Sequence, residues 1–137
     1  MSPAMYRELI QGSHKKTIDY AHSLGLPVIM HACGFVEPLL PYMTEAGIDC
    51  LQVIEVKAGM DSFAIKRDYG EKLTLHGGID AALWHNKDAV MAEIERVVPV
   101  LKENGGYIFS SDHSIPNTVS VENFKAIIDT VKRCGRY

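Results

Sequence analysis

The order of hydrophobic and polar positions along the chain predicts five helices alternating with four short strands. Ser2 and Pro3 are typical of a helix start, and the first helix is expected to continue to about Leu24, just before Gly25. The apolar run 26–30 has the length of a strand and lacks polar alternation, which suits a parallel strand covered on both faces. Further strands are expected at 50–56, 73–76 and 107–110, and further helices at 36–46, 61–69, 87–103 and 121–133.

The predicted order is therefore one helix followed by four strand–helix units, α(βα)4, with parallel strands joined by short crossovers. A small open α/β sheet and half of an eight-stranded (β/α)8, or TIM, barrel both have this order. Polar residues and glycines follow each predicted strand, at 31–34, 55–57, 76–80 and 110–113. A barrel would bring all four groups to one rim. An open sheet binds its ligand at a single point where the strand order reverses, so it would not need polar residues after every strand. We therefore predict half of a TIM barrel, with residues 1–137 as a single domain.

His31 and Cys33 flank Ala32 at the end of the first predicted strand. Strand alternation places both side chains on the same face, and Gly34 lets the chain turn away directly afterwards. Imidazole and thiolate are preferred zinc ligands, and a catalytic zinc takes about three protein ligands and keeps one open position. The pair predicts part of a metal site, and its alternative is a buried cysteine beside a histidine bonded to backbone.

Asp112 and His113 follow the fourth predicted strand and are candidate catalytic residues. A histidine at this position can be a third metal ligand or a general acid or base. In a barrel it would face His31 across the mouth. The alternative is Asp112 as a turn residue and His113 as a surface side chain.

The middle strands carry weaker candidates. His76, Gly78 and Asp80 are predicted to bind substrate, because glycines let backbone approach a ligand and Asp80 can hold a polar group. Asp80 is equally well explained as a cap. Glu55 is a candidate catalytic carboxylate, since a charge in an apolar strand is costly unless it serves a site or an ion pair, here with Lys57.

Composition narrows the class of protein. The 137 residues are 47% hydrophobic and 23% charged with a net charge of −3, which is typical of a globular domain and excludes disorder. The charge gives no basic surface for nucleic acid or an anionic membrane. The three cysteines form an odd set, which favours a reducing, cytoplasmic compartment. No apolar run approaches the roughly 20 residues of a membrane-spanning helix.

The residues at the strand ends resemble a known family. The matching runs, in order, are PVIMHACG, EAGIDCLQV, GMD, KRDYGEKLTLHGGID, GGYIFSSDHSIP and SVENFKAI. Together they look like the C-terminal half of the uroporphyrinogen decarboxylase superfamily, which also contains corrinoid-dependent methyltransferases. The resemblance covers nearly the whole chain, and it implies a single βα barrel of which this chain supplies about half.

The resemblance implies specific chemistry in the methyltransferase branch. There a His-x-Cys pair and a third ligand in the last strand's loop hold a zinc that activates a thiol, and His31 and Cys33 match the pair. The third ligand is usually cysteine, and His113 stands at that position. The decarboxylase branch has a histidine in the same loop, which His113 also matches.

The residues and the resemblance together leave three functions open. The first is a zinc-dependent, corrinoid-linked methyltransferase fragment, in which methylcobamide on a partner protein gives a methyl group to a small-molecule thiol. The second is porphyrinogen decarboxylation. The third is a catalytically incomplete half-barrel that self-associates, because open sheet edges and a bare inner face favour a homo-oligomer or a swapped dimer.

Overall fold

The computed structural model describes residues 1–137 and contains one parallel sheet in the order β1-β2-β3-β4. The strands are β1 (Ile29–His31), β2 (Cys50–Ile54), β3 (Thr74–Gly77) and β4 (Tyr107–Ile108). The helices are α1 (Pro3–Leu9), α2 (Gln11–Ser23), α3 (Leu40–Ala46), α4 (Ser62–Tyr69), α5 (Lys87–Leu101) and α6 (Val121–Cys134). Short 3-10 helices η1 (Glu37–Leu39), η2 (Val56–Ala58) and η3 (Ala81–His85) occur in the loops.

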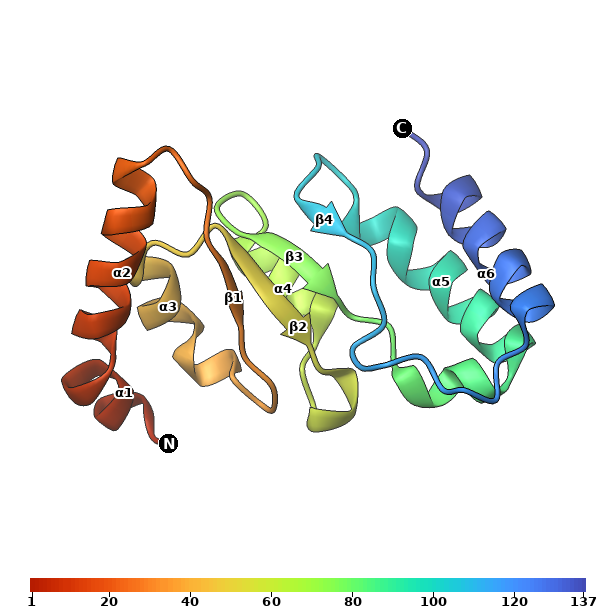
Figure 1. The fold of residues 1–137 in the computed structure, drawn as a ribbon, viewed down its shortest axis with the longest axis horizontal. Helices are drawn as coiled ribbons and strands as arrows, with labels where there is room; N and C mark the ends of the chain where they lie inside the picture. The colour runs from red at the N-terminus through yellow and green to blue at the C-terminus, as the bar shows by residue number, and fades with distance from the viewer.

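Sequential parallel strands, each followed by a helix, form half of a TIM barrel, as the α(βα)4 pattern predicts. Figure 1 shows the helices beside and behind the sheet, while the other face of the sheet looks toward the viewer. Side-chain caps begin the later helices, because oxygens of Asp61, Asn86 and Ser120 accept first-turn backbone N–H groups of α4, α5 and α6. No helix has both the length and the hydrophobicity required to cross a bilayer.

The prediction of one continuous first helix is wrong. The chain breaks at Ile10, which has φ −119°, so that α1 and α2 are separate helices. Tyr6 and Ile18, twelve positions apart, are both 2% exposed. On a straight helix of about 3.6 residues per turn they would point about 120° apart. The break therefore allows both side chains to enter the same core.

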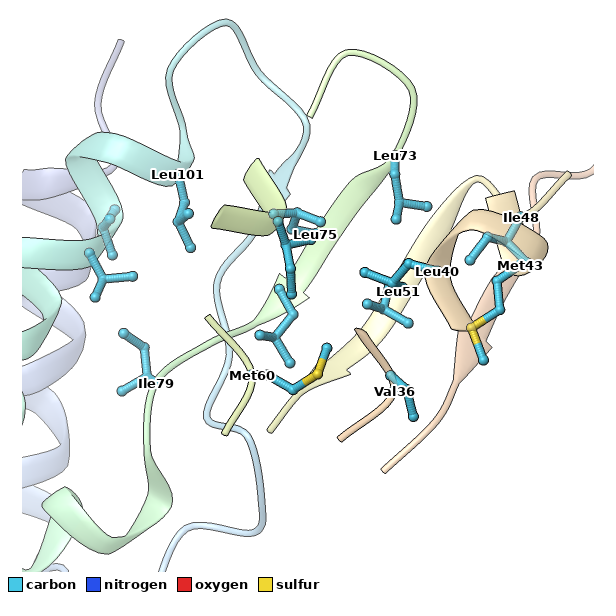
Figure 2. Close-up of a cluster of buried hydrophobic side chains, with 14 of the residues drawn as sticks. Val36, Leu40, Met43, Ile48, Leu51, Met60, Leu73, Leu75, Ile79 and Leu101 are labelled. Atoms are coloured by element: carbon cyan, nitrogen blue, oxygen red, sulfur yellow. The ribbon is translucent and has the colours of Figure 1, made fainter. Parts of the chain in front are cut away.

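The core lies between the helices and the outer face of the sheet. Leu51 of β2 and Leu75 of β3, paired in register, are fully buried there. Figure 2 shows Leu51 beside Leu40 of α3, and Leu75 next to β3 in the same cluster of buried side chains. Burying each such leucine contributes about 1.5–3 kcal/mol to the free energy of unfolding. This apolar layer therefore stabilises the sheet that carries the strand-end loops.

The inner face of the sheet is largely uncovered, which corrects the expectation for the first strand. That strand begins at Ile29, later than predicted, and Ile29 is 56% exposed instead of covered on both faces. Ile108 of β4 is 42% exposed on the same face. In a half-barrel this concave face is the inner wall, and no helix packs against it. Polar residues on it are therefore accessible from one side.

Candidate functional site

The first and fourth strand-end loops meet at a cavity of about 290 Å³ on the rim of the half-barrel. His31 and Cys33 line it from the β1 side, and the segment Ser111–Ser114 lines it from the loop after β4. A parallel bridge between Ile79 and Ser111 extends the β3–β4 pairing toward the rim and holds that loop. The structure thus brings together the residues proposed as metal ligands around one hollow.

His31 and Cys33 form a direct contact at this cavity. His31 is the last residue of β1 and Cys33 follows two positions later, so their side chains point the same way. The Cys33 sulfur lies 3.1 Å from His31 Nε2, and the thiol is free and exposed. On the other side of the ring, His31 Nδ1 hydrogen-bonds Gln52 Oε1. The imidazole is therefore held between two polar partners.

The pair has suitable donors for zinc. Nitrogen and sulfur ligands at about 2.0 and 2.3 Å from a tetrahedral zinc lie about 3.5 Å apart, which is close to the 3.1 Å observed. His113 is exposed on the wall of the same cavity. The structure holds no group of three or more His, Cys, Asp and Glu side chains gathered as one metal site. Two of the three expected ligands are thus adjacent, and the part of His113 as the third stays a prediction.

Glu55 holds the cysteine-bearing loop. It lies directly after β2, beyond the strand's observed end at Ile54, and its carboxylate accepts the Gly34 N–H at 2.6 Å. Lys57 Nζ lies 3.8 Å from its other oxygen, so the ion pair considered from the sequence is present. Gly34 has φ +90°, a conformation that favours glycine. These contacts assign Glu55 a positioning role, and its catalytic role stays a prediction.

Asp112 bonds to two other loops of the rim. It is 2% exposed, and its two carboxylate oxygens accept the Val56 N–H at 3.1 Å and the Ala81 N–H at 2.8 Å. Its own N–H donates to the Ile79 carbonyl at 2.8 Å. The loops after β2, β3 and β4 are therefore joined through one side chain. A carboxylate occupied in this way acts as an anchor, and proton transfer by Asp112 stays a prediction.

The predicted substrate-binding residues His76, Gly78 and Asp80 do not form one cluster. His76 lies on the inner face of β3, paired in register with Gln52. Gly78 instead packs against Ser62 and Leu101, on the helix side, where it lines a different hollow of about 320 Å³. Asp80 accepts the Ala82 N–H at 2.8 Å and caps η3, as the alternative prediction of a structural cap expects.

His76 differs from the other two residues because its ring is partly buried with one unpartnered nitrogen. Burial lowers the pKa of its imidazole, and its Nδ1 atom is buried without a hydrogen-bond partner. Burial thus favours the neutral form of the ring. The part of all three residues in substrate binding stays a prediction.

Gln52 is a site residue that the sequence reasoning missed. It is the one half-exposed position in β2, whose other residues are all buried, and it lies in register between His31 and His76. A signal was available, because a single amide in the apolar run CLQVI is as unusual as a charge there. Register between strands was needed to connect it with His31.

Comparison with known proteins places the chain in a family. The uroporphyrinogen decarboxylase (URO-D) family model matches residues 1–134. A uroporphyrinogen decarboxylase from Pelobacter propionicus is 27% identical over 137 residues, 99% of this chain and 39% of that protein. A methylated-thiol–coenzyme M methyltransferase from Methanosarcina mazei is 29% identical over 80 residues, 58% of this chain and 20% of that protein.

A solved structure shows the same fold. A methyltransferase from Methanosarcina mazei superposes with a TM-score of 0.70 at 24% identity, covering 97% of this chain and 38% of that one. The chain thus spans about two fifths of the relatives that it matches end to end. The relatives include both decarboxylases and a methyltransferase, at similar identity. On the match over residues 1–134, the chain belongs to the uroporphyrinogen decarboxylase family.

Proposed function

We propose that this chain carries the zinc- and thiol-binding part of a methyltransferase site, with His31, Cys33 and His113 as the zinc ligands. The observation that supports this most strongly is the 3.1 Å contact between Cys33 Sγ and His31 Nε2 at a cavity that His113 also lines. Neither decarboxylation nor a purely structural role needs a thiol exposed at this point.

The proposed chemistry is methyl transfer to a small-molecule thiol. Zinc, when bound, is a Lewis acid that lowers the pKa of a coordinated thiol, so that the sulfur is a thiolate at neutral pH. The methyl group would come from methylcobamide on a partner corrinoid protein, which would keep the electrons of the broken carbon–cobalt bond, and His31, Cys33 and His113 would hold the zinc. The named activity of the Methanosarcina mazei relative, which concerns a methylated thiol, supports this choice of substrate class.

The residues of this chain orient the site. Glu55 fixes the loop that carries Cys33, and Asp112 anchors the segment next to His113. The uncovered inner face leaves access to His31 and His76 from the concave side. Asp80, which caps η3, would help to shape the rim.

Metal analysis tests the proposal. We expect wild-type protein, loaded with zinc and dialysed, to retain about one zinc per chain by inductively coupled plasma mass spectrometry. Cys33→Ala and His31→Ala should each lose most of it. Cys134→Ala, at the end of α6, is the matched control and should retain it. A wild-type chain that takes up no zinc would refute the proposal.

Porphyrinogen decarboxylation is the second candidate, because the relatives that match end to end include uroporphyrinogen decarboxylases. In that function His113, exposed at the cavity, contacts a propionate of the substrate. It predicts porphyrin binding that is independent of zinc, measured as an absorbance change on titration. His113→Ala would weaken that binding, whereas Cys33→Ala would not.

A third candidate is a half-barrel without activity of its own that self-associates. The exposed Ile29 and Ile108 support it, because they lie on the two edge strands of the inner face. A second copy that closes an eight-stranded barrel would cover both. This candidate predicts a dimer or larger species in light scattering and no turnover of either substrate, whereas a monomer of about 15 kDa would exclude self-association.

A further inference from the structure

Gln52 lies in the middle of the inner face, next to the proposed metal ligands. Strand register pairs it with His31 of β1 and with His76 of β3. Its backbone is fixed, since its carbonyl accepts the Ala32 N–H at 2.7 Å. Its neighbours in β2 are buried, whereas its own side chain is half-exposed and lines the cavity with His31 and Cys33. The amide is therefore presented to His31 from a rigid element.

The contact between Gln52 and His31 selects one form of the imidazole. The Gln52 atom that faces His31 Nδ1 is the carbonyl oxygen Oε1, which only accepts hydrogen bonds. Nδ1 must then carry the proton, and the lone pair of the neutral ring lies on Nε2. On that side the Cys33 sulfur lies 3.1 Å from Nε2, where its S–H can donate to the lone pair. Both contacts thus favour the same tautomer.

We propose that Gln52 is a positioning residue that holds His31 in its Nδ1–H tautomer, with the Nε2 lone pair directed at the cavity beside Cys33. The inference rests on the proposed zinc site, because Nε2 is then the atom that binds the metal. Histidine ligands commonly donate their other ring N–H to an acceptor that fixes the ring, and loss of that acceptor costs about 10- to 100-fold in metal affinity. No ligand role is assigned to Gln52 itself.

The first test measures the tautomer directly in the metal-free chain. Long-range ¹H–¹⁵N correlation spectra of the protein with labelled histidine distinguish Nδ1–H from Nε2–H, and loss of one spin system in His31→Asn assigns the signal. We expect Nδ1–H for His31 at a pH where the ring is neutral. A wild-type ring in the Nε2–H form overturns the inference, even if zinc binds. This measurement requires neither zinc nor a Gln52 variant that folds.

The second test measures zinc affinity by competition with a chromophoric chelator. Gln52→Leu removes the acceptor at similar size and should lose the Nδ1–H preference and weaken zinc binding about 10- to 100-fold. Gln52→Glu keeps the side-chain length and can only accept, so it should retain both. The chain's other glutamine provides the matched control, since Gln11 bonds Tyr42 and Glu45 away from the site, and Gln11→Leu should leave the affinity unchanged.

The outcomes separate the two proposals. An Nδ1–H ring in wild type that is lost in Gln52→Leu supports the positioning role on the protein side. Absence of zinc uptake by that same wild-type chain refutes the proposed function and leaves the tautomer assignment standing. Unchanged zinc affinity and an unchanged tautomer in folded Gln52→Leu overturn the positioning role.

Discussion

Replacing Asp112 with alanine should cost more stability than any other single change to a charged residue in this chain. Its carboxylate accepts two backbone N–H groups, from Val56 and Ala81, inside a site where Asp112 is 2% exposed. An unpaired buried donor costs about 1–3 kcal/mol, so two of them cost about 2–6 kcal/mol. Domains of ordinary stability have only about 5–15 kcal/mol in total. The substitution should therefore remove a large part of the free energy of unfolding.

Urea unfolding followed by circular dichroism measures this loss. With a slope of about 2 kcal/mol per molar urea, the middle of the usual range, the midpoint should fall by about 1–3 M. Asp129→Ala provides the control, because Asp129 is exposed on α6 and changes of that kind stay within about 0.5 kcal/mol. Hydrogen exchange at the Val56 and Ala81 amides should accelerate in the Asp112 variant. A midpoint equal to that of the control would refute the anchoring role of Asp112.

Three further predictions follow from single contacts. Glu55→Ala should speed amide exchange at the glycine it holds and cost about 1–2 kcal/mol, whereas Glu55→Gln, which keeps an acceptor oxygen, should cost less. Gly77→Ala places a Cβ 2.8 Å from a β2 side chain at φ +113° and should lower the free energy of unfolding by about 1–3 kcal/mol. As a control, a Cβ at the helical position Gly12 meets nothing within 4 Å, so Gly12→Ala should raise the free energy of unfolding by up to about 1 kcal/mol. The hydrogen bond from His22 lowers the pKa of Asp49, so its contribution to stability is present above pH ~4 and disappears as the pH falls further, and Asp49→Asn should flatten this part of the pH–stability curve.

Element order was predictable from the sequence because glycines and apolar runs mark it directly. Gly47, with φ +101°, ends α3 directly after the helix predicted at 36–46, and Asp61, at the start of the helix predicted at 61–69, caps α4. The break at Ile10 was not predictable, since it results from the need to bury Tyr6 and Ile18 together, which is a property of the tertiary core.

The candidate site was predictable only in part. The His-x-Cys pair follows from strand alternation, and its meeting with the His113 loop follows from the barrel. Strand-end position does not tell which side of the sheet a residue faces, and Gly78, predicted together with His76, lies on the helix side. The role of Gln52 depends on register between strands, which one sequence read alone does not contain.

X-ray absorption at the zinc edge, on the full chain loaded with one equivalent of zinc, tests the central claim most directly. The proposal predicts one sulfur at about 2.3 Å and two imidazole nitrogens at about 2.0–2.1 Å, from Cys33, His31 and His113. In His113→Ala one nitrogen should be replaced by a water oxygen while the sulfur stays. A zinc shell without sulfur, or a spectrum unchanged in Cys33→Ala, would contradict the assignment of this cavity as the zinc site.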